Sequence, residues 1–167
     1  MDGSDIFSEL AARPVRVVVV RALRLGDLLC AVPALRALRA ALPQAEITLI
    51  GLPLAREFVR RCRYVDRFEE FPGYPGIADQ EVQPARTVAF LTRMQAYGFD
   101  LSVQLHGSGV FSNPFTRLLG AQRMVFGSGS PLFDQETEMA RVQHLHVSDA
   151  DTSLILGGRL AALLRSD

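Results

Sequence analysis

The amino-acid sequence predicts one α/β domain of Rossmann-like type, in which helices flank a parallel sheet. A length of 167 residues is typical of one domain that can bury a substantial core. The run Arg16–Val20 is β-branched after its first residue, as in a strand that a parallel sheet buries on both faces. Segments of strand and helix character then alternate along the chain, which is the pattern of a doubly wound parallel sheet.

The first half of the chain continues this alternation. Apolar residues at helical spacing predict a helix over 27–42, in which Pro33 either fits an early turn or kinks the helix. A strand over 46–51 and a helix over 54–62 follow. A weaker strand with alternating polarity covers 64–70, and we expect it near an edge of the sheet.

A break rich in proline and glycine follows residue 70 and begins a long loop that reaches residue 84. Loops of this length tend to be mobile or functional. The elements predicted beyond it are, in order, a helix over 85–97, a strand over 99–105, a helix capped by Ser112, a strand over 123–127 and a last helix over 151–164. The strands at 16–20 and 99–105 are candidates for neighbours in the sheet.

Composition excludes some classes of function. The formal net charge is zero, whereas a general nucleic-acid binder normally carries a basic excess. All 18 basic residues are arginine, which fits either a coding bias or a surface selected to bind anions. The two cysteines, Cys30 and Cys62, lie in apolar helical patterns and are expected to be buried free thiols in a reducing compartment. The first 12 residues lack the basic start of a signal peptide, so a cytoplasmic location is expected.

The loop after the first strand carries an acidic residue at the start of a helix. Ligands of open α/β sheets bind outside the carboxyl ends of the strands, where Arg24, Gly26 and Asp27 are expected to lie. One glycine without a GxGxxG pattern does not favour a dinucleotide site. Asp27 has two compatible interpretations: it caps its helix, or its carboxylate is a general base for a hydroxyl group.

The loop after the strand at 99–105 is expected at the same edge. His106, Gly107 and Ser108 supply an imidazole, backbone amides and a hydroxyl, and Asn113 follows at the next helix. The segment does not match G-x-S-x-G, so a nucleophilic serine is disfavoured. Two interpretations remain, a tight turn with a satisfied histidine and a loop that positions a sugar or phosphate.

Two other clusters offer weaker candidates for a site. His144 and His146 have the spacing of an H-x-H pair, but no further ligand cluster supports a metal site, so none is predicted. The basic patch at 60–63, at a helix end, is either a solvated face or a contact with acidic lipid headgroups, which would place the protein peripherally on a membrane.

Several separated segments together resemble the ADP-heptose:lipopolysaccharide heptosyltransferase family, glycosyltransferase family 9. The segments that carry the resemblance are 17–29 with 32–39, 45–51, 98–109 with 112–114, and 118–123. They agree with the family in order and spacing, from about residue 16 to residue 146. The likeness weakens over 128–147, a polar and irregular stretch whose role it leaves open.

The resemblance implies a fold and an activity. Family members are inverting, metal-independent enzymes of the GT-B type, whose amino-terminal domain binds the acceptor and whose carboxyl-terminal domain binds the nucleotide of the donor. The Gly-Asp aspartate, here Asp27, is the family's catalytic base, and no cofactor is expected in this half. The acceptor, a sugar or lipid-linked sugar of lipopolysaccharide type, is then expected to contact Arg24, Gly26, His106, Gly107, Ser108 and Asn113.

A full family member is about twice as long, as expected for two domains. We therefore expect a flexible segment over 1–13, an acceptor-binding domain over 14–147, and a helix within 148–167 that leads toward a missing donor domain. Such a half is expected to be inactive alone, and its uncovered face could form a homodimer. The alternative is a non-catalytic Rossmann-like binding module. A flavodoxin-like or response-regulator-like domain is less consistent with the loops.

Overall fold

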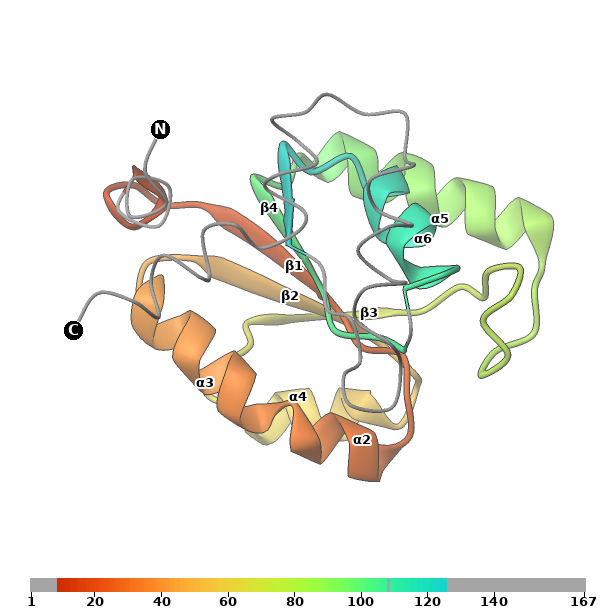
Figure 1. The fold of residues 1–167 in the computed structure, drawn as a ribbon, viewed down its shortest axis with the longest axis horizontal. Helices are drawn as coiled ribbons and strands as arrows, with labels where there is room; N and C mark the ends of the chain where they lie inside the picture. Colours follow the sequence, from red (N-terminus) through yellow and green to blue (C-terminus); the bar gives the residue numbers. More distant parts are fainter. Residues whose placement is uncertain (1–8, 108, 126–167) are drawn as a thin grey trace.

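The computed structural model describes residues 9–107 and 109–125, which form a five-stranded parallel sheet with helices on both faces (Figure 1). The strands are β1 (Arg16–Val20), β2 (Glu46–Gly51), β3 (Arg67–Glu70), β4 (Leu101–Gln104) and β5 (Arg123–Val125). Their order in the sheet is β3-β2-β1-β4-β5, and every neighbouring pair is parallel. The predicted Rossmann-like class is confirmed, as is the pairing of the strands now labelled β1 and β4.

The helices divide between the two faces of the sheet. They are α2 (Leu25–Cys30), α3 (Val32–Ala41), α4 (Ala55–Arg61), α5 (Pro84–Tyr97) and α6 (Ser112–Leu118). Helices α2, α3 and α4 cover one face, and α5 and α6 cover the other (Figure 1). Alternate residues of β1 serve both layers, because Val17 and Val19 pack with the first group and Val18 and Val20 with the second. This two-sided burial explains the unbroken valine run.

The helix predicted over 27–42 is two helices. It is divided at Ala31, and Pro33 occupies the first turn of α3, where a proline needs no hydrogen-bond donor. The Ala31 amide therefore bonds to the Leu28 carbonyl instead of continuing the ladder of α2. Pro33 thus lies in an early turn, as the first of the two alternatives has it, but the turn belongs to a second helix and not to one continuous helix.

Some sequence predictions about burial and capping were wrong. Cys30 is exposed and Cys62 is half-buried, because each lies at the end of a helix, where the core layer does not fully cover it. Phe111, not Ser112, is the N-cap residue of α6, and no side chain caps that helix. Ser112 instead donates its hydroxyl proton to the carbonyl of His106 at 2.6 Å, which satisfies a buried group of the preceding loop.

The edges of the described region also differ in detail from expectation. Strand β3 begins only at Arg67, but it lies at the sheet edge as predicted. A helical turn over 9–11, inside the segment expected to be flexible, places Leu10 in the core with no exposed surface. The predictions for 126–167, including the last helix and the histidine pair, lie outside the described residues.

Candidate functional site

The loops after β1 and β4 lie together at the carboxyl edge of the sheet. Parallel pairing of β1 with β4 ends at Val20 opposite Gln104, so the following residues of both strands emerge side by side. Arg21 joins them directly. Its Nε and Nη2 donate to the Asp27 carbonyl at 3.1 and 2.7 Å, and its Nη1 donates to the Leu105 carbonyl.

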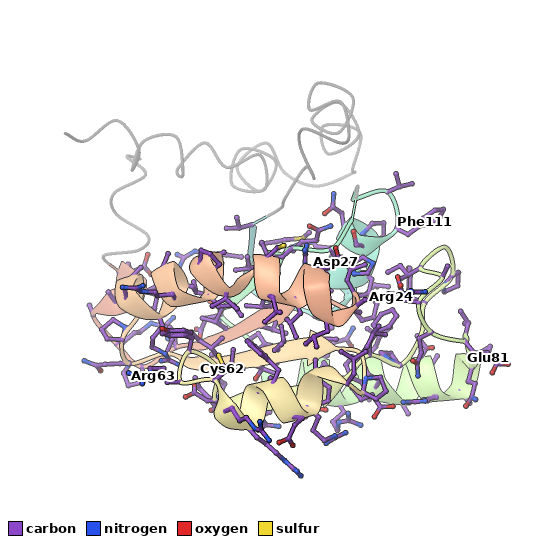
Figure 2. The ribbon with its side chains drawn as sticks, turned by 90° about the horizontal axis from the view of Figure 1, so that it is seen from below. Arg24, Asp27, Cys62, Arg63, Glu81 and Phe111 are labelled. Atoms are coloured by element: carbon purple, nitrogen blue, oxygen red, sulfur yellow. The ribbon has the colours of Figure 1, made fainter. Side chains whose placement is uncertain are left out.

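Asp27 is exposed and occupies the third position of α2. The N-cap residue is Arg24, whose backbone is extended and whose side chain makes no capping bond. The interpretation of Asp27 as a helix cap was therefore wrong, because the helix begins two residues earlier than expected. Within the part of the chain that the structure describes, the Asp27 carboxylate has no hydrogen bond or ion pair. Figure 2 shows Asp27 at the N-terminal end of α2.

Gly26 and Arg24 lie beside Asp27 on the same exposed turn. A Cβ built on Gly26 would meet no atom within 4 Å, and the residue does not have a positive φ. The backbone conformation therefore does not require glycine here. Because Gly26 has no side chain, the space next to the Asp27 carboxylate stays open. The positively charged side chain of Arg24 is exposed to solvent.

His106 lies under the second loop and is 6% exposed. Its carbonyl oxygen accepts bonds from Gln104 Nε2 and Ser112 Oγ, both at 2.6 Å, which fixes the backbone at this point. Its Nδ1 is buried and has no hydrogen-bond partner among the described residues. Burial lowers the pKa of His106, and the charge of Arg21 lowers it further, against the opposing effects of Asp79 and Asp27. The imidazole is therefore neutral at neutral pH and can accept or donate one bond.

The rest of the second loop is only partly described. Gly107 has a φ of +59°, a left-handed conformation that glycine adopts without strain. Ser108 lies outside the described residues. Asn113 is 4% exposed, and its Oδ1 is a second buried polar atom for which residues 9–107 and 109–125 supply no partner. Unpaired buried polar atoms are rare, and two of them lie close together in the sequence here, one in the second loop and one in the first turn of α6.

Two residues of this edge were missed in the sequence. Asp79, on the loop between β3 and α5, is near enough to raise the pKa of His106. Phe111, between β4 and α6, is 49% exposed. In the sequence, Asp79 lies in an unusually long loop that ends at 84, and Phe111 is an aromatic residue directly before the helix at 112. Neither feature shows that these residues lie close to the loop of His106.

Other predicted contacts have narrower support. In the basic patch, Arg60 and Arg61 both pair with Glu57, at 3.5 and 2.8 Å, which reduces the charge that the patch presents. Among the described residues there is no group of three His, Cys, Asp or Glu side chains arranged to hold a metal ion. The helices of the described ranges are all too short or too polar to cross a bilayer.

The fold and site together define an α/β domain with a hydrogen-bonding edge at the carboxyl ends of β1 and β4. This fold is that of one domain of a family 9 glycosyltransferase. The crystal structure of the glycosyl transferase family 9 from Veillonella parvula DSM 2008 matches it with a TM-score of 0.56 and 18% sequence identity. The match covers 84% of this chain and 44% of that chain, so the chain spans less than half of that protein's length.

At 18% identity the likeness establishes the fold, which is that of half a GT-B enzyme. It agrees with the family resemblance found in the motifs. No protein-family model matches the sequence, and a search of curated proteins gave no match. The activity must therefore be argued from the site itself.

Proposed function

We propose that this chain is the acceptor-binding domain of an inverting glycosyltransferase related to family 9, with Asp27 as the general base. The observation that carries the proposal is the Asp27 carboxylate, exposed and without a partner in the described residues, beside a neutral His106. A base must be free to meet the proton that it removes. A carboxylate committed to a cap or an ion pair would not be.

In the proposed reaction, an acceptor hydroxyl attacks the anomeric carbon of a nucleotide-activated sugar. Asp27 takes the hydroxyl proton as the new carbon–oxygen bond forms. The bond from the anomeric carbon to the nucleotide phosphate breaks on the opposite face, and the nucleotide leaves with the electron pair. Attack and departure on opposite faces invert the configuration.

The neighbouring polar groups suit a hydroxyl-rich acceptor. Asn113 Oδ1 and the imidazole of His106 are hydrogen-bond partners that remain unused in the described structure. Accepting groups of this kind pair with sugar hydroxyls, and Arg24 and Gly26 lie on the first loop, which emerges beside the second. We propose a sugar or lipid-linked sugar of lipopolysaccharide type as the acceptor. A second domain would bind the nucleotide of the donor.

The test is a transfer assay on the chain joined in frame to a donor-binding domain of family 9, with nucleotide release as the readout. Asp27→Asn keeps the size of the side chain and removes its basicity, so we expect the rate to fall by about 100-fold or more. Glu57→Gln is the matched control, because Glu57 is the acidic residue in the first turn of α4. It should leave the rate unchanged.

Unimpaired turnover in Asp27→Asn would contradict the assignment of the base. Background activity in the wild-type fusion, together with intact sugar binding by the chain, would favour the alternative of a non-catalytic binding module. The reading frame downstream of Asp167 offers a separate check, since continuation into a second α/β domain supports the enzyme.

A further inference from the structure

Phe111 is the one aromatic side chain among the large hydrophobic residues that the described ranges leave exposed. It lies in the loop between β4 and α6, five positions after His106 and two before Asn113. The other described phenylalanines that pack near this loop, such as Phe71 and Phe115, have no exposed surface. A large apolar ring that is exposed at the edge of a polar site is typical of a surface that binds a ligand or a partner.

The ring of Phe111 lies against Gly76, from the loop between β3 and α5. A Cβ built on Gly76 would lie 2.3 Å from Cδ1, 2.3 Å from Cγ and 2.5 Å from Cδ2 of the ring. A point almost equally distant from three carbons of a hexagon lies close to the axis of that hexagon. Gly76 therefore faces the ring rather than its edge, and the contact exists because glycine has no Cβ.

This contact fixes the orientation of the ring. One face of Phe111 is covered by the backbone of Gly76, and 49% of the residue stays exposed. The loop that holds Gly76 is itself anchored, because Ile77 is buried in the core and Thr87 donates to the Gly73 carbonyl at 3.0 Å. Figure 2 shows Phe111, Arg24 and Asp27 at the same end of the molecule.

We propose that Phe111 is a stacking platform for the apolar face of a pyranose ring. The face of an aromatic ring is electronegative and attracts the slightly positive C–H groups of a sugar. The exposed side chains of Arg24 and Asp27, at the same end of the molecule (Figure 2), offer hydrogen-bond partners for the hydroxyl groups of a sugar. Stacking on one side with hydrogen bonding on the other fits a carbohydrate better than an apolar partner, which would leave these groups unpaired. The inference rests on the proposed function only in taking the acceptor to be a sugar.

The experiment measures binding by the chain alone, with methyl glycopyranosides as probes and the open-chain polyol mannitol as comparison. Saturation-transfer NMR should show transfer from aromatic protons to the ring C–H protons of a pyranoside and little transfer to mannitol. Phe111→Ala should weaken pyranoside binding at least fivefold, and Phe111→Tyr should retain it. Leu118→Ala removes another exposed apolar side chain, 42% exposed on α6, and should leave binding unchanged.

A second pair of variants tests the orientation of the ring. Gly76→Ala places a methyl group where the ring now lies, so binding should fall although Phe111 is retained. Gly98→Ala is the matched control, because Gly98 has a similar φ of +75° against +83°, but a Cβ added to it would meet no atom within 4 Å. It carries the same backbone strain without touching the platform and should bind pyranoside normally.

Three outcomes would overturn the platform. The first is wild-type chain that binds no pyranoside at about 50 mM, a concentration near the weakest affinity worth detecting. The second is Phe111→Ala that binds like wild type, and the third is an equal loss in Phe111→Ala and Leu118→Ala. None of these bears on Asp27, whose role is decided by the transfer rate of the fusion. Conversely, an active Asp27→Asn fusion would refute the base and leave pyranoside stacking standing.

Discussion

Replacing Arg21 by methionine should loosen the two loops that form the site. Among the described residues, Arg21 bonds both loops at once, through the carbonyls of Asp27 and Leu105. The Asp27 carbonyl can accept these bonds because the Ala31 amide, which would bond to it in a continuous helix, donates to the Leu28 carbonyl at the end of α2. The break before Pro33 thus creates the acceptor that Arg21 uses. Methionine keeps the apolar stem and removes every donor.

The size of the effect follows from the exposure of these bonds. A hydrogen bond to a charged donor contributes about 1.5–3 kcal/mol when it is shielded from water. The bond to Leu105 is part-buried, whereas both bonds to Asp27 are exposed and water can replace them. We therefore expect Arg21→Met to lower the free energy of unfolding by about 2 kcal/mol. For a domain of this size that is a fall in Tm of roughly 4–8 °C.

The assay is thermal and urea unfolding of the chain, with Arg60→Met as control. Arg60 is an arginine with a 70% exposed side chain whose ion pair with Glu57 is 3.5 Å long, so its loss should cost less than about 0.5 kcal/mol. NMR titration of His106 supplies a second readout, since loss of the Arg21 charge should raise the pKa of His106. A midpoint within about 1 °C of wild type, or an unchanged His106 pKa, would refute the bridging role.

Two further predictions concern His106 and the aromatic core. Burial holds the pKa of His106 below its unfolded value, so the unfolded chain binds the extra proton and stability is lost as pH falls through about 6.5. Urea unfolding at pH 7.5 and 5.5 should show a smaller pH dependence for His106→Gln, and equal dependence would argue against a buried neutral imidazole. Phe115 is fully buried, with ring centroids of Phe71 and Tyr74 at 5.1 and 5.3 Å, so Phe115→Ala should cost about 3–5 kcal/mol. A loss below about 1 kcal/mol in the same assay would show that the loop beside α6 does not depend on this packing.

The fold was predictable because its signals are local. The valine run of β1 and the alternation of strands and helices specify a parallel sheet without knowledge of any long-range contact. Capping was less predictable, since it depends on where backbone angles change. The helix that holds Asp27 starts at Leu25, so the residue expected to cap it lies inside its first turn. Ser112 was misjudged for the same reason, because a buried carbonyl of the loop competes for its hydroxyl.

The site was predicted in part. Adjacent parallel strands bring the loops of Asp27 and His106 to one edge, and that follows from topology alone. The contribution of the third loop does not, because Asp79 and Gly76 approach His106 and Phe111 only through the packing of a long connection. Sequence periodicity carries no information about such a loop. Its anchors, Phe71 and Ile77, can be recognised as core residues only in the structure.

Under the proposed function, the exposure of Asp27 gives the donor-binding domain a role beyond holding the donor. In open solvent, water competes with the acceptor hydroxyl for the carboxylate, and water is also a nucleophile that can hydrolyse an activated sugar. The chain holds two parts of the site in place: Arg21 joins the backbone of Asp27 to that of Leu105, next to His106, and Gly76 orients Phe111. The residues that the structure describes leave Asp27 exposed. A donor-binding domain closing over this edge would exclude water at the moment when the sugar arrives, so binding of acceptor and chemistry would be separable in the way the proposed variants test.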